Sequence, residues 1–406
     1  MERKVSERII AGLDLGSSSV KYLIAEEADG NASIIGVGIV PSKSINKGFV
    51  VDLNKASDAI VQAKKQAEAM SGKKASTVYV TVSGAHIFSV NNRGVIVISK
   101  DGREIGADDI KRVEESAKVL LLQPNQKIIH ILPRQFIIDG QGGIRNPIGM
   151  SGIKLEEEVH IVTSSSTALY NIGKCISMAE LELGSFVLQS LASSYSILGD
   201  QEKDLGIALL DIGAGTGDLI LYVNGNIAHT TVLPIGGEYI TKDIAFALRI
   251  SLEEAEKVKK QYGFVITKKG DIPSGEVEIE KVSTNEKFSV PYTEIGEIVT
   301  SRVDEILEGI RLELMKSGFW SSIPAGIVIT GGCALLKGFA ERASEILEIP
   351  SRVGFPKSDF ALSDILSSPE YSASVGLIRY AMENEKVVRK RSDLWKSLSW
   401  LKDIFE

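Results

Sequence analysis

The sequence predicts an α/β protein built from two lobes that repeat one fold, and three observations carry this prediction. Its 406 residues allow two to four compact domains, and 44% of them are hydrophobic, so sizeable cores can form. Apolar, strand-like runs alternate with segments of helical periodicity. A pattern of strand, Asp, Gly-containing turn and strand at Asp14 returns at Asp211, which indicates two similarly folded lobes.

Composition excludes several classes of protein. The net charge of −7 gives no broad positive field for a polyanion, so we expect no nucleic-acid partner. Cys175 and Cys333 stand in unrelated contexts, which fits a reducing cytosol better than a disulfide framework or a zinc site. No apolar run approaches the roughly 20 residues needed to cross a bilayer, and the charged N-terminus lacks a signal-peptide core.

The first lobe is predicted to combine a strand meander with a packed helix. We assign to it residues 1–83 and 164–190, and expect about 359–385 to return to it. Apolar and small residues at helical spacing predict a helix over 57–70 that stops before Gly72. The expected strands lie at 9–15, 20–25, 33–40 and 77–82.

Residues 84–163 read as a small inserted α+β subdomain. Alternating apolar residues predict strands, and Asp108 opens a segment of helical spacing. The expected strands are 87–98, 128–138 and 159–163, and the expected helix is 108–122.

The second lobe is assigned residues 191–242 and 323–358, with its own insertion over 243–322. Helices are expected at 166–179 and 192–198 before it, strands at 205–211, 219–223 and 325–329, and a helix at 339–347. The insertion is predicted to begin with helices, to pass through a charged, turn-rich stretch over 268–287, and to end in a long helix over 294–316.

The two repeated turns are candidates for binding phosphate. Glycine permits close backbone approach, and successive amides form a nest for an anion, so two such hairpins can clamp a polyphosphate from both sides. Asp14 and Asp211 stand at equivalent strand ends, where a carboxylate can hold Mg²⁺ through its waters. Either turn alone is typical of an ordinary hairpin, and the matched pair favours the phosphate interpretation.

Two further motifs are weaker by themselves. Gly331 and Gly332 follow a predicted strand and precede a helix, where a base or α-phosphate can approach the backbone; an ordinary turn is equally compatible. Ser251 is an expected N-cap for a helix whose Glu256 and Lys259 share one face and can hydrogen-bond ribose hydroxyls. A solvated charged face is the alternative.

In this order the motifs resemble the superfamily of actin, the heat-shock ATPase chaperones and the sugar kinases. Within it, several segments resemble the family of FtsA, the bacterial cell-division actin homologue, from about residue 10 to the end. These are 92–95, 130–133, 139–144, 147–152, 158–163 and 191–195.

The resemblance implies an actin-like, two-lobed ATPase fold with a small α+β subdomain inserted. It also implies a cleft that binds ATP and Mg²⁺, with these residues around the nucleotide: Gly16, Ser17, Ser18 and Lys21 on the first phosphate loop, Gly213, Gly215 and Thr216 on the second, and Glu256, Lys259, Gly331, Gly332 and Leu336 near the nucleoside.

Catalysis is expected to be slow at most. Gln189 stands where related actin-like ATPases often carry Glu followed by Pro, and here Ser190 follows it. A neutral amide can orient a water molecule but cannot take its proton, so Asp14, Gln189 and Asp211 are tentative catalytic residues only. The four histidines are scattered along the sequence and are expected to be structural or to lie at the surface: His86, His130, His160 and His229.

The last residues predict a membrane-binding helix over 392–406, after a short linker at 386–391. One apolar stripe at about 100° per residue contains Leu394, Trp395, Leu398, Leu401 and Phe405. About 15 residues reach roughly 22 Å, which suits a helix lying in the interface, and the basic 389–391 can contact anionic lipids. A helix docked on the protein's own core is the alternative.

The resemblance therefore implies an ATP-binding tether that polymerises and holds FtsZ filaments at the cytoplasmic face of the membrane at the division site. Expected partners are the FtsZ C-terminal peptide at Arg302, further copies of the chain, anionic lipids and other division proteins. A small-molecule kinase of the same fold and a PilM-like pilus-assembly scaffold are the alternatives.

Overall fold

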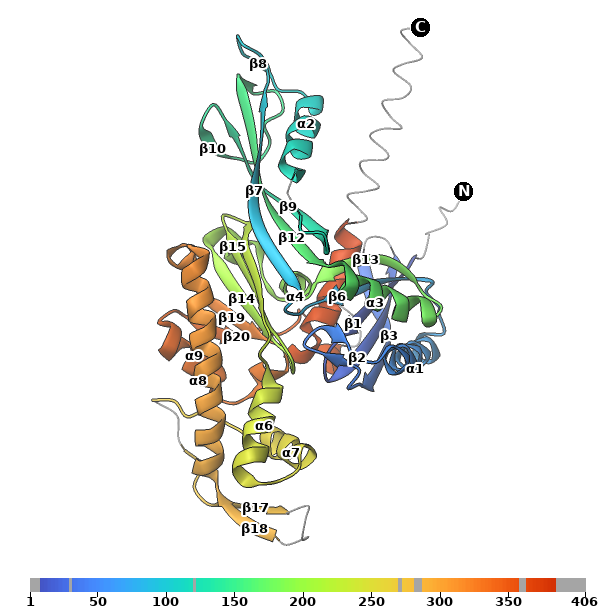
Figure 1. The fold of residues 1–406 in the computed structure, drawn as a ribbon, viewed down its shortest axis with the longest axis vertical. Helices are drawn as coiled ribbons and strands as arrows, with labels where there is room; N and C mark the ends of the chain where they lie inside the picture. Colours follow the sequence, from blue (N-terminus) through green and yellow to red (C-terminus); the bar gives the residue numbers. More distant parts are fainter. Residues whose placement is uncertain are drawn as a thin grey trace.

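The computed structural model describes residues 8–28, 31–119, 122–268, 272–280, 287–357 and 363–384. Two lobes lie side by side, and the subdomain 84–163 rises from the junction between them (Figure 1). The predicted linker 386–391 and terminal helix 392–406 lie outside the described residues. Within the described part of the chain, no helix is both long enough and apolar enough to cross a bilayer.

The first lobe holds a five-stranded sheet in the order β13-β6-β1-β2-β3, in which the three strands of the predicted meander pair antiparallel and β6 and β13 run parallel to β1. Helix α1 (Leu53–Ser71) covers one face, beginning after the N-cap Asp52 and ending at the left-handed Gly72. The bounds are β1 Arg8–Leu15, β2 Ser19–Ala28, β3 Asn31–Pro41, β6 Thr77–Val82, β13 Glu182–Leu188 and, beside α1, α3 Ser166–Met178.

The opposite face of this sheet is covered by residues from the end of the described chain. A helix over 372–384 packs Val375, Ile378 and Met382 against Ile10 and Ile34. A Cβ on Gly12 would lie 3.2 Å from side-chain atoms of this helix, so glycine permits the close approach.

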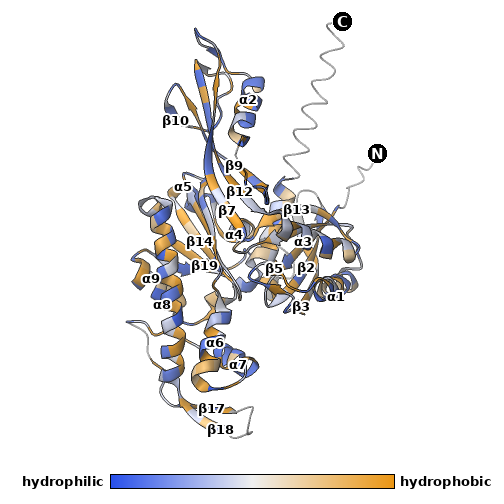
Figure 2. Ribbon diagram, viewed as in Figure 1, coloured by the Kyte–Doolittle hydropathy of each residue, from blue (hydrophilic) through white to orange (hydrophobic). Residues whose placement is uncertain are grey.

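The second lobe repeats the arrangement. Its sheet has the order β16-β15-β14-β19-β20, again an antiparallel meander followed by two parallel strands, so the predicted repeat of one fold is confirmed. The strands are β14 Ile207–Ile212, β15 Gly217–Val223, β16 Asn226–Leu233, β19 Ile327–Thr330 and β20 Ser351–Val353. Strands β14 and β19 consist mainly of hydrophobic residues (Figure 2), as expected for strands that are buried on both faces.

The second lobe and its insertion also contain the helices α6 Gly237–Leu248, α7 Leu252–Tyr262, α8 Tyr292–Ser317 and α9 Phe339–Leu347. The stretch 268–287, read from sequence as turn-rich, contains strand β17 (Glu276–Glu280), which pairs with β18 (Lys287–Pro291). Among the hairpin residues that the structure describes, Val277, Ile279 and Val290 are the buried apolar ones. The charged residues alternate with these apolar ones and belong to the exposed face of the hairpin. Because charged residues are so numerous in this stretch, the alternation typical of a strand was not recognised in the sequence.

The inserted subdomain has a sheet of order β10-β9-β12-β7 and a helix, α2 (Ala107–Lys118), that packs on β7 and β12. Strand β12 extends from Lys154 to Ser165, well beyond the expected 159–163, because it pairs along its whole length with β7 and β9. The remaining bounds are β7 Ile87–Val97, β8 Arg103–Glu104, β9 Gln126–Ile138, β10 Gln141–Ile144 and β11 Ser151–Gly152.

Short elements join the lobes. The chain crosses through α4, which begins at Gln189, three residues before the predicted helix. A two-stranded hairpin of β4 and β5 stands at the edge of the first lobe. The bounds are β4 Ile45–Asn46, β5 Phe49–Val50, α4 Gln189–Ile197, α5 Asp200–Leu205, α10 Ser363–Leu366, and the 3₁₀ turns η1 Trp320–Ser322, η2 Gly332–Leu335 and η3 Pro369–Tyr371.

Candidate nucleotide-binding site

A cavity of about 470 Å³ opens between the lobes, and every residue predicted for nucleotide, metal or catalysis lines it. The first lobe supplies the turn after β1, and the second supplies the turn after β14 together with α7 and η2. These residues are Asp14, Gly16, Ser17, Ser18, Lys21, Gln189, Asp211, Gly213, Gly215, Thr216, Glu256, Lys259, Gly331, Gly332 and Leu336. The roles assigned to these residues stay predictions. What the structure adds is that all of them line the same cavity.

The two predicted phosphate loops have the same local geometry. The amide of Gly16 donates to the carbonyl oxygen of Ser19 at 3.1 Å, and the amide of Gly213 donates to that of Thr216 at 2.9 Å. The loops also meet each other: a Cβ on Gly215 would lie 2.5 Å from the Ser17 hydroxyl. A side chain at 215 would force Ser17 to shift, so glycine at this position favours the close approach of the two lobes.

Asp14 is a fully paired, buried carboxylate. It accepts hydrogen bonds from Lys21 Nζ (3.0 Å), Thr81 Oγ1 (2.8 Å) and Ser374 Oγ (3.0 Å). Burial alone would raise the pKa of Asp14, but the charge of Lys21 and these three donors outweigh it and lower the pKa below its ordinary value. Asp14 is therefore ionised at neutral pH.

Asp211, its counterpart in the second lobe, has the opposite electrostatic environment. Burial and the nearby Asp14 raise the pKa of Asp211 to about 6, although hydrogen bonds from Ser193 (2.5 Å) and Gln189 oppose the rise. The direct bond from Lys21 to Asp14, which Asp211 lacks, accounts for the lower pKa of Asp14. Asp14 stands opposite Lys21, whereas Asp211 stands opposite Asp218.

Asp218 was missed by the sequence analysis. It is fully buried and accepts from Ser83 Oγ (2.8 Å) and Thr216 Oγ1 (2.9 Å), two residues that line the cavity. Its other oxygen, Oδ1, has no hydrogen-bond partner among the described residues. Burial and the adjacent Asp211 raise the pKa of Asp218 to about 8. Its place opposite Asp211, equivalent to that of Lys21, was the signal that could have identified it.

Glu256 and Lys259 form an ion pair in the cavity wall. Lys259 Nζ lies 2.6 Å from the Glu256 carboxylate and also donates to the carbonyl oxygen of Gly237 (3.1 Å) and to Thr241 Oγ1 (2.8 Å). Burial would raise the pKa of Glu256, but Lys259 and Thr241 lower it overall. The pair is thus fixed in place beside the cavity, as a ribose-binding pair would need to be.

The segment before and within the helix 372–384 also reaches the cavity, which the sequence did not indicate. Glu370 and Ala373 line it, and the ring of Tyr371 lies 5.8 Å from Lys21 Nζ. Only the tertiary fold brings these residues back to the first phosphate loop.

The donor set fits Mg²⁺ held through water and phosphate oxygens. Asp14 already accepts hydrogen bonds at both oxygens, so it has little capacity for direct coordination. No group of three acidic, histidine or cysteine side chains in the described ranges is arranged to hold a metal ion by itself. A nucleotide would therefore supply the remaining oxygen ligands.

Arg302, predicted to bind the partner peptide, lies outside the cavity on α8. Its guanidinium donates to Asp243 from Nε (2.5 Å) and Nη2 (2.9 Å), and to Glu305 from Nη1 (2.5 Å). The bonds to Asp243 raise the pKa of Arg302 further above its ordinary value. The ion pair with Asp243 could not be inferred from the sequence, because α6 meets α8 only in the folded chain.

The histidines are scattered in sequence, but three of them lie close to one another where the inserted subdomain meets the lobes: His130, His160 and His229. His160 contacts Asn91 Oδ1 (2.7 Å) and Thr230 Oγ1 (2.9 Å), and His130 Nε2 accepts from the amide of Leu188 (3.0 Å). Burial, then the nearby His229, lowers the pKa of His160 to about 3. These neutral rings connect the subdomain to the lobes.

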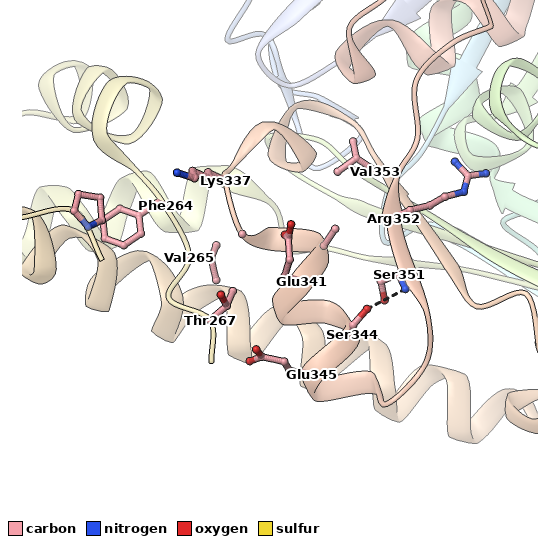
Figure 3. A pocket seen from close by; sticks show the side chains of 13 residues that line it. Phe264, Val265, Thr267, Lys337, Glu341, Ser344, Glu345, Ser351, Arg352 and Val353 are labelled. Carbon is pink, nitrogen blue, oxygen red and sulfur yellow. Dashed lines mark hydrogen bonds between the residues drawn. The ribbon is translucent and has the colours of Figure 1, made fainter. Parts of the chain in front are cut away.

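A second cavity, of about 740 Å³, lies at the outer side of the second lobe (Figure 3). Its walls come from the segment after α7, from α9 and from β20. Lys337, Glu341 and Arg352 are among the residues that line it, and Arg352 pairs with Glu202 at 2.6 Å. None of the predicted site residues lines it.

Comparison with known proteins identifies the family to which the sequence is similar. Residues 208–376 match the family described as "Cell division protein FtsA", and residues 84–163 match the "SHS2 domain inserted in FTSA". The FtsA proteins of *Pseudomonas aeruginosa* and *Bacillus subtilis* are 38% and 37% identical, each over 94% of this chain and 91% and 85% of their own length. That of *Escherichia coli* K12 is 32% identical, over the whole of both chains.

Solved structures show the same fold. One is described as "PilM-PilN type IV pilus biogenesis complex", with a TM-score of 0.68, 16% identity, and coverage of 92% of this chain and 98% of that chain. MreB5 of *Spiroplasma citri* bound to ADP gives 0.58 at 15% identity, covering 95% and 98%. These neighbours confirm the actin-like fold, and the curated relatives decide the family. The chain belongs to the FtsA family of bacterial cell division proteins.

Proposed function

We propose that this protein binds Mg-ATP between its lobes, assembles into actin-like filaments, and tethers FtsZ filaments to the cytoplasmic face of the membrane at the division site. Family membership places it in cell division. The observation that carries the nucleotide part is the convergence of both Gly-Ser turns, Lys21 and the Glu256–Lys259 pair on one cavity.

The cavity has the chemistry of a polyphosphate site. Amides of the two turns provide donors from both lobes, the Lys21 ammonium provides a cation from the first lobe, and Lys259 provides a second cation from the second lobe. Gln189, which hydrogen-bonds Asp211, supplies no general base. ATP is thus expected to act mainly as a ligand that holds the lobes together.

The FtsZ C-terminal peptide is proposed to bind on α6 and α8 around Arg302. An acidic peptide would compete with Asp243 and Glu305 for the guanidinium, and Arg302 keeps partial exposure, 20% of its side chain. Phe246 on α6 is 87% exposed, one turn after Asp243, and offers an apolar contact beside the charge. Charge-assisted hydrogen bonds with one apolar anchor suit a short peptide.

Membrane attachment is proposed to come from the predicted helix 392–406, through lipid contacts of Leu394, Trp395, Leu398, Leu401 and Phe405. A small-molecule kinase would have no use for such a helix. The PilM-like alternative is supported by fold likeness alone, at 16% identity, and is not favoured by the curated relatives.

Co-sedimentation with anionic liposomes, with and without Mg-ATP and with a FtsZ C-terminal peptide, tests the whole proposal. The full chain should pellet with vesicles and carry the peptide with it. A chain truncated after Arg391, or carrying Trp395→Glu, should stay in the supernatant and still bind ATP. If the truncated chain pellets equally, the terminal helix is not the membrane anchor; if it unfolds, the helix belongs to the core.

A further inference from the structure

The aromatic ring of Tyr239 on α6 is approached by three cations that come from both lobes. Lys47 Nζ, from the first lobe, lies 4.6 Å from the ring centroid, and it donates a 2.5 Å hydrogen bond to the Tyr239 hydroxyl. Lys242 Nζ and Arg302 Cζ, from the second lobe, each lie 5.4 Å from the centroid. One side chain therefore connects the first lobe to the proposed partner-binding arginine.

Lys47 is fixed to the edge of the nucleotide cavity. It occupies the turn between β4 and β5 with a left-handed φ of 49°, and the next residue, Gly48, lines the cavity. A Cβ on Gly48 would lie 1.8 Å from the carbonyl oxygen of Ser83, so this turn is packed against the lobe without room to shift. Lys47 must therefore move with the first lobe.

Tyr239 is fixed to the second phosphate loop. At the start of α6, the amides of Gly237 and Glu238 donate to the carbonyl oxygens of Gly213 (3.0 Å) and Ala214 (2.9 Å). A Cβ on Gly236 would lie 2.6 Å from the Ala214 oxygen. Helix α6 must therefore move with this loop, and any separation of the lobes withdraws Lys47 from Tyr239.

The Lys47–Tyr239 contact changes the balance of charge around the Tyr239 ring. Arg302 is paired with two carboxylates, Asp243 and Glu305, and Lys242 is paired with Glu238 at 3.4 Å. Lys47 forms no ion pair with any carboxylate that the structure describes. Its ammonium and the Arg302 guanidinium are at most about 10 Å apart across the ring, about one Debye length at 0.1 M salt. A docked Lys47 thus offsets the negative charge that the second carboxylate leaves beside Arg302.

We propose that the Lys47–Tyr239 contact couples nucleotide occupancy to partner binding. A nucleotide that closes the lobes docks Lys47 on Tyr239, the positive potential at Arg302 rises, and an acidic peptide binds more tightly. Without nucleotide the lobes separate more readily and the extra charge is withdrawn. This coupling rests on the proposed function, and it is reciprocal: the peptide must tighten nucleotide binding by the same factor.

The test measures affinity for a FtsZ C-terminal peptide with and without Mg-ATP, by fluorescence anisotropy on the full chain. The wild type should bind at least about 5-fold more tightly with Mg-ATP, the low end of typical allosteric coupling. Lys47→Met should reduce this ratio to below about 2-fold and leave the affinity without nucleotide unchanged. Tyr239→Phe keeps the ring and loses the hydroxyl acceptor, so it should give an intermediate ratio.

Lys43→Met is the matched control, because it removes the same charge from the same segment at a side chain that is 92% exposed. It should retain the wild-type ratio, and circular dichroism and ATP affinity should show each variant folded and able to bind nucleotide. An equal ratio in wild type and Lys47→Met, or an equal loss in Lys43→Met, overturns the coupling and leaves the proposed function standing. A wild type that binds neither ATP nor peptide overturns both.

Discussion

Ser374 donates a 3.0 Å hydrogen bond from Oγ to Oδ2 of Asp14, a residue 360 positions earlier in the chain. Both side chains are buried. The helix 372–384 thereby touches the first phosphate loop, while its other end precedes the predicted linker and membrane helix. The same segment meets the second lobe, because Ser372 Oγ lies 2.7 Å from Thr330 Oγ1.

Ser374→Ala should destabilise the protein by about 1.5–3 kcal/mol at pH 7, because a hydrogen bond to a buried carboxylate is lost. The lowered pKa of Asp14 contributes stability that is present above its unfolded value of about 3.9 and is lost as the pH falls toward the folded value. The deficit of the variant should therefore shrink below pH 4. Chemical denaturation at several pH values measures it. Ser301→Ala, at an exposed serine of α8, should change stability by under about 0.5 kcal/mol.

Gly215→Leu should abolish ATP binding. Its Cβ alone would lie 2.5 Å from Ser17 Oγ and 3.3 Å from the Lys47 backbone nitrogen, so the lobes cannot close over phosphate. Calorimetry with Mg-ATP measures the loss. Combining Gly215→Ala with Ser17→Gly tells whether contact between the loops is the cause. If this pair restores no affinity over Gly215→Ala alone, the added methyl group instead occupies the phosphate position.

His86→Phe should stabilise the protein increasingly as the solution is acidified. Burial lowers the pKa of His86 to about 4, and within the described residues neither ring nitrogen has a hydrogen-bond partner. Between the unfolded value of about 6.5 and the folded value, only the unfolded chain binds the proton, so acid costs up to about 1.4 kcal/mol per pH unit.

Phenylalanine keeps the ring that packs 4.6 Å from Phe49 and removes this titration. The difference in unfolding free energy between variant and wild type should be constant above pH 7 and should grow from pH 6.5 to 4. A difference that does not vary with pH would show that His86 is protonated in the folded protein.

ATP hydrolysis should be slower than about 1 per second, because Gln189 is a neutral amide that can orient a water molecule but cannot take its proton. Gln189→Glu should raise single-turnover hydrolysis while ATP affinity stays similar. Wild-type turnover within the kinase-like range of about 1 to 100 per second would contradict the assignment.

Arg302→Glu should weaken binding of the FtsZ C-terminal peptide by tenfold or more, an effect of about 1.4 kcal/mol, and should spare ATP binding. Arg311→Glu is the control, since Arg311 lies on the same helix and pairs with Glu308 at 3.7 Å. The swapped pair Arg302→Asp with Asp243→Arg separates structure from recognition. If the swap restores peptide binding fully, Arg302 acts through its ion pair and not through direct contact.

The sequence by itself determined the duplicated strand-turn-strand units, the fold class and the residues of the two turns that meet at the cavity. These features are local: a strand alternation, a turn rich in glycine and a helix period are each written in a few consecutive residues. The repeat of Asp14 at Asp211 then predicted that two distant segments share one cleft. The hairpin β17–β18 was not predicted, because few apolar residues lie on its buried face.

Only the tertiary structure decided how these residues are charged and partnered. Asp14 and Asp211 are equivalent in sequence but have different cross-strand partners. Asp14 stands opposite Lys21, whose buried charge lowers the pKa of Asp14. Asp211 stands opposite Asp218, and burial raises the pKa of Asp211. Ser374, Asp243 and Tyr239 reach their partners across long separations in the chain. Sequence periodicity reports which face of an element is buried, but only the packed fold determines which side chains meet there and which charges remain uncompensated.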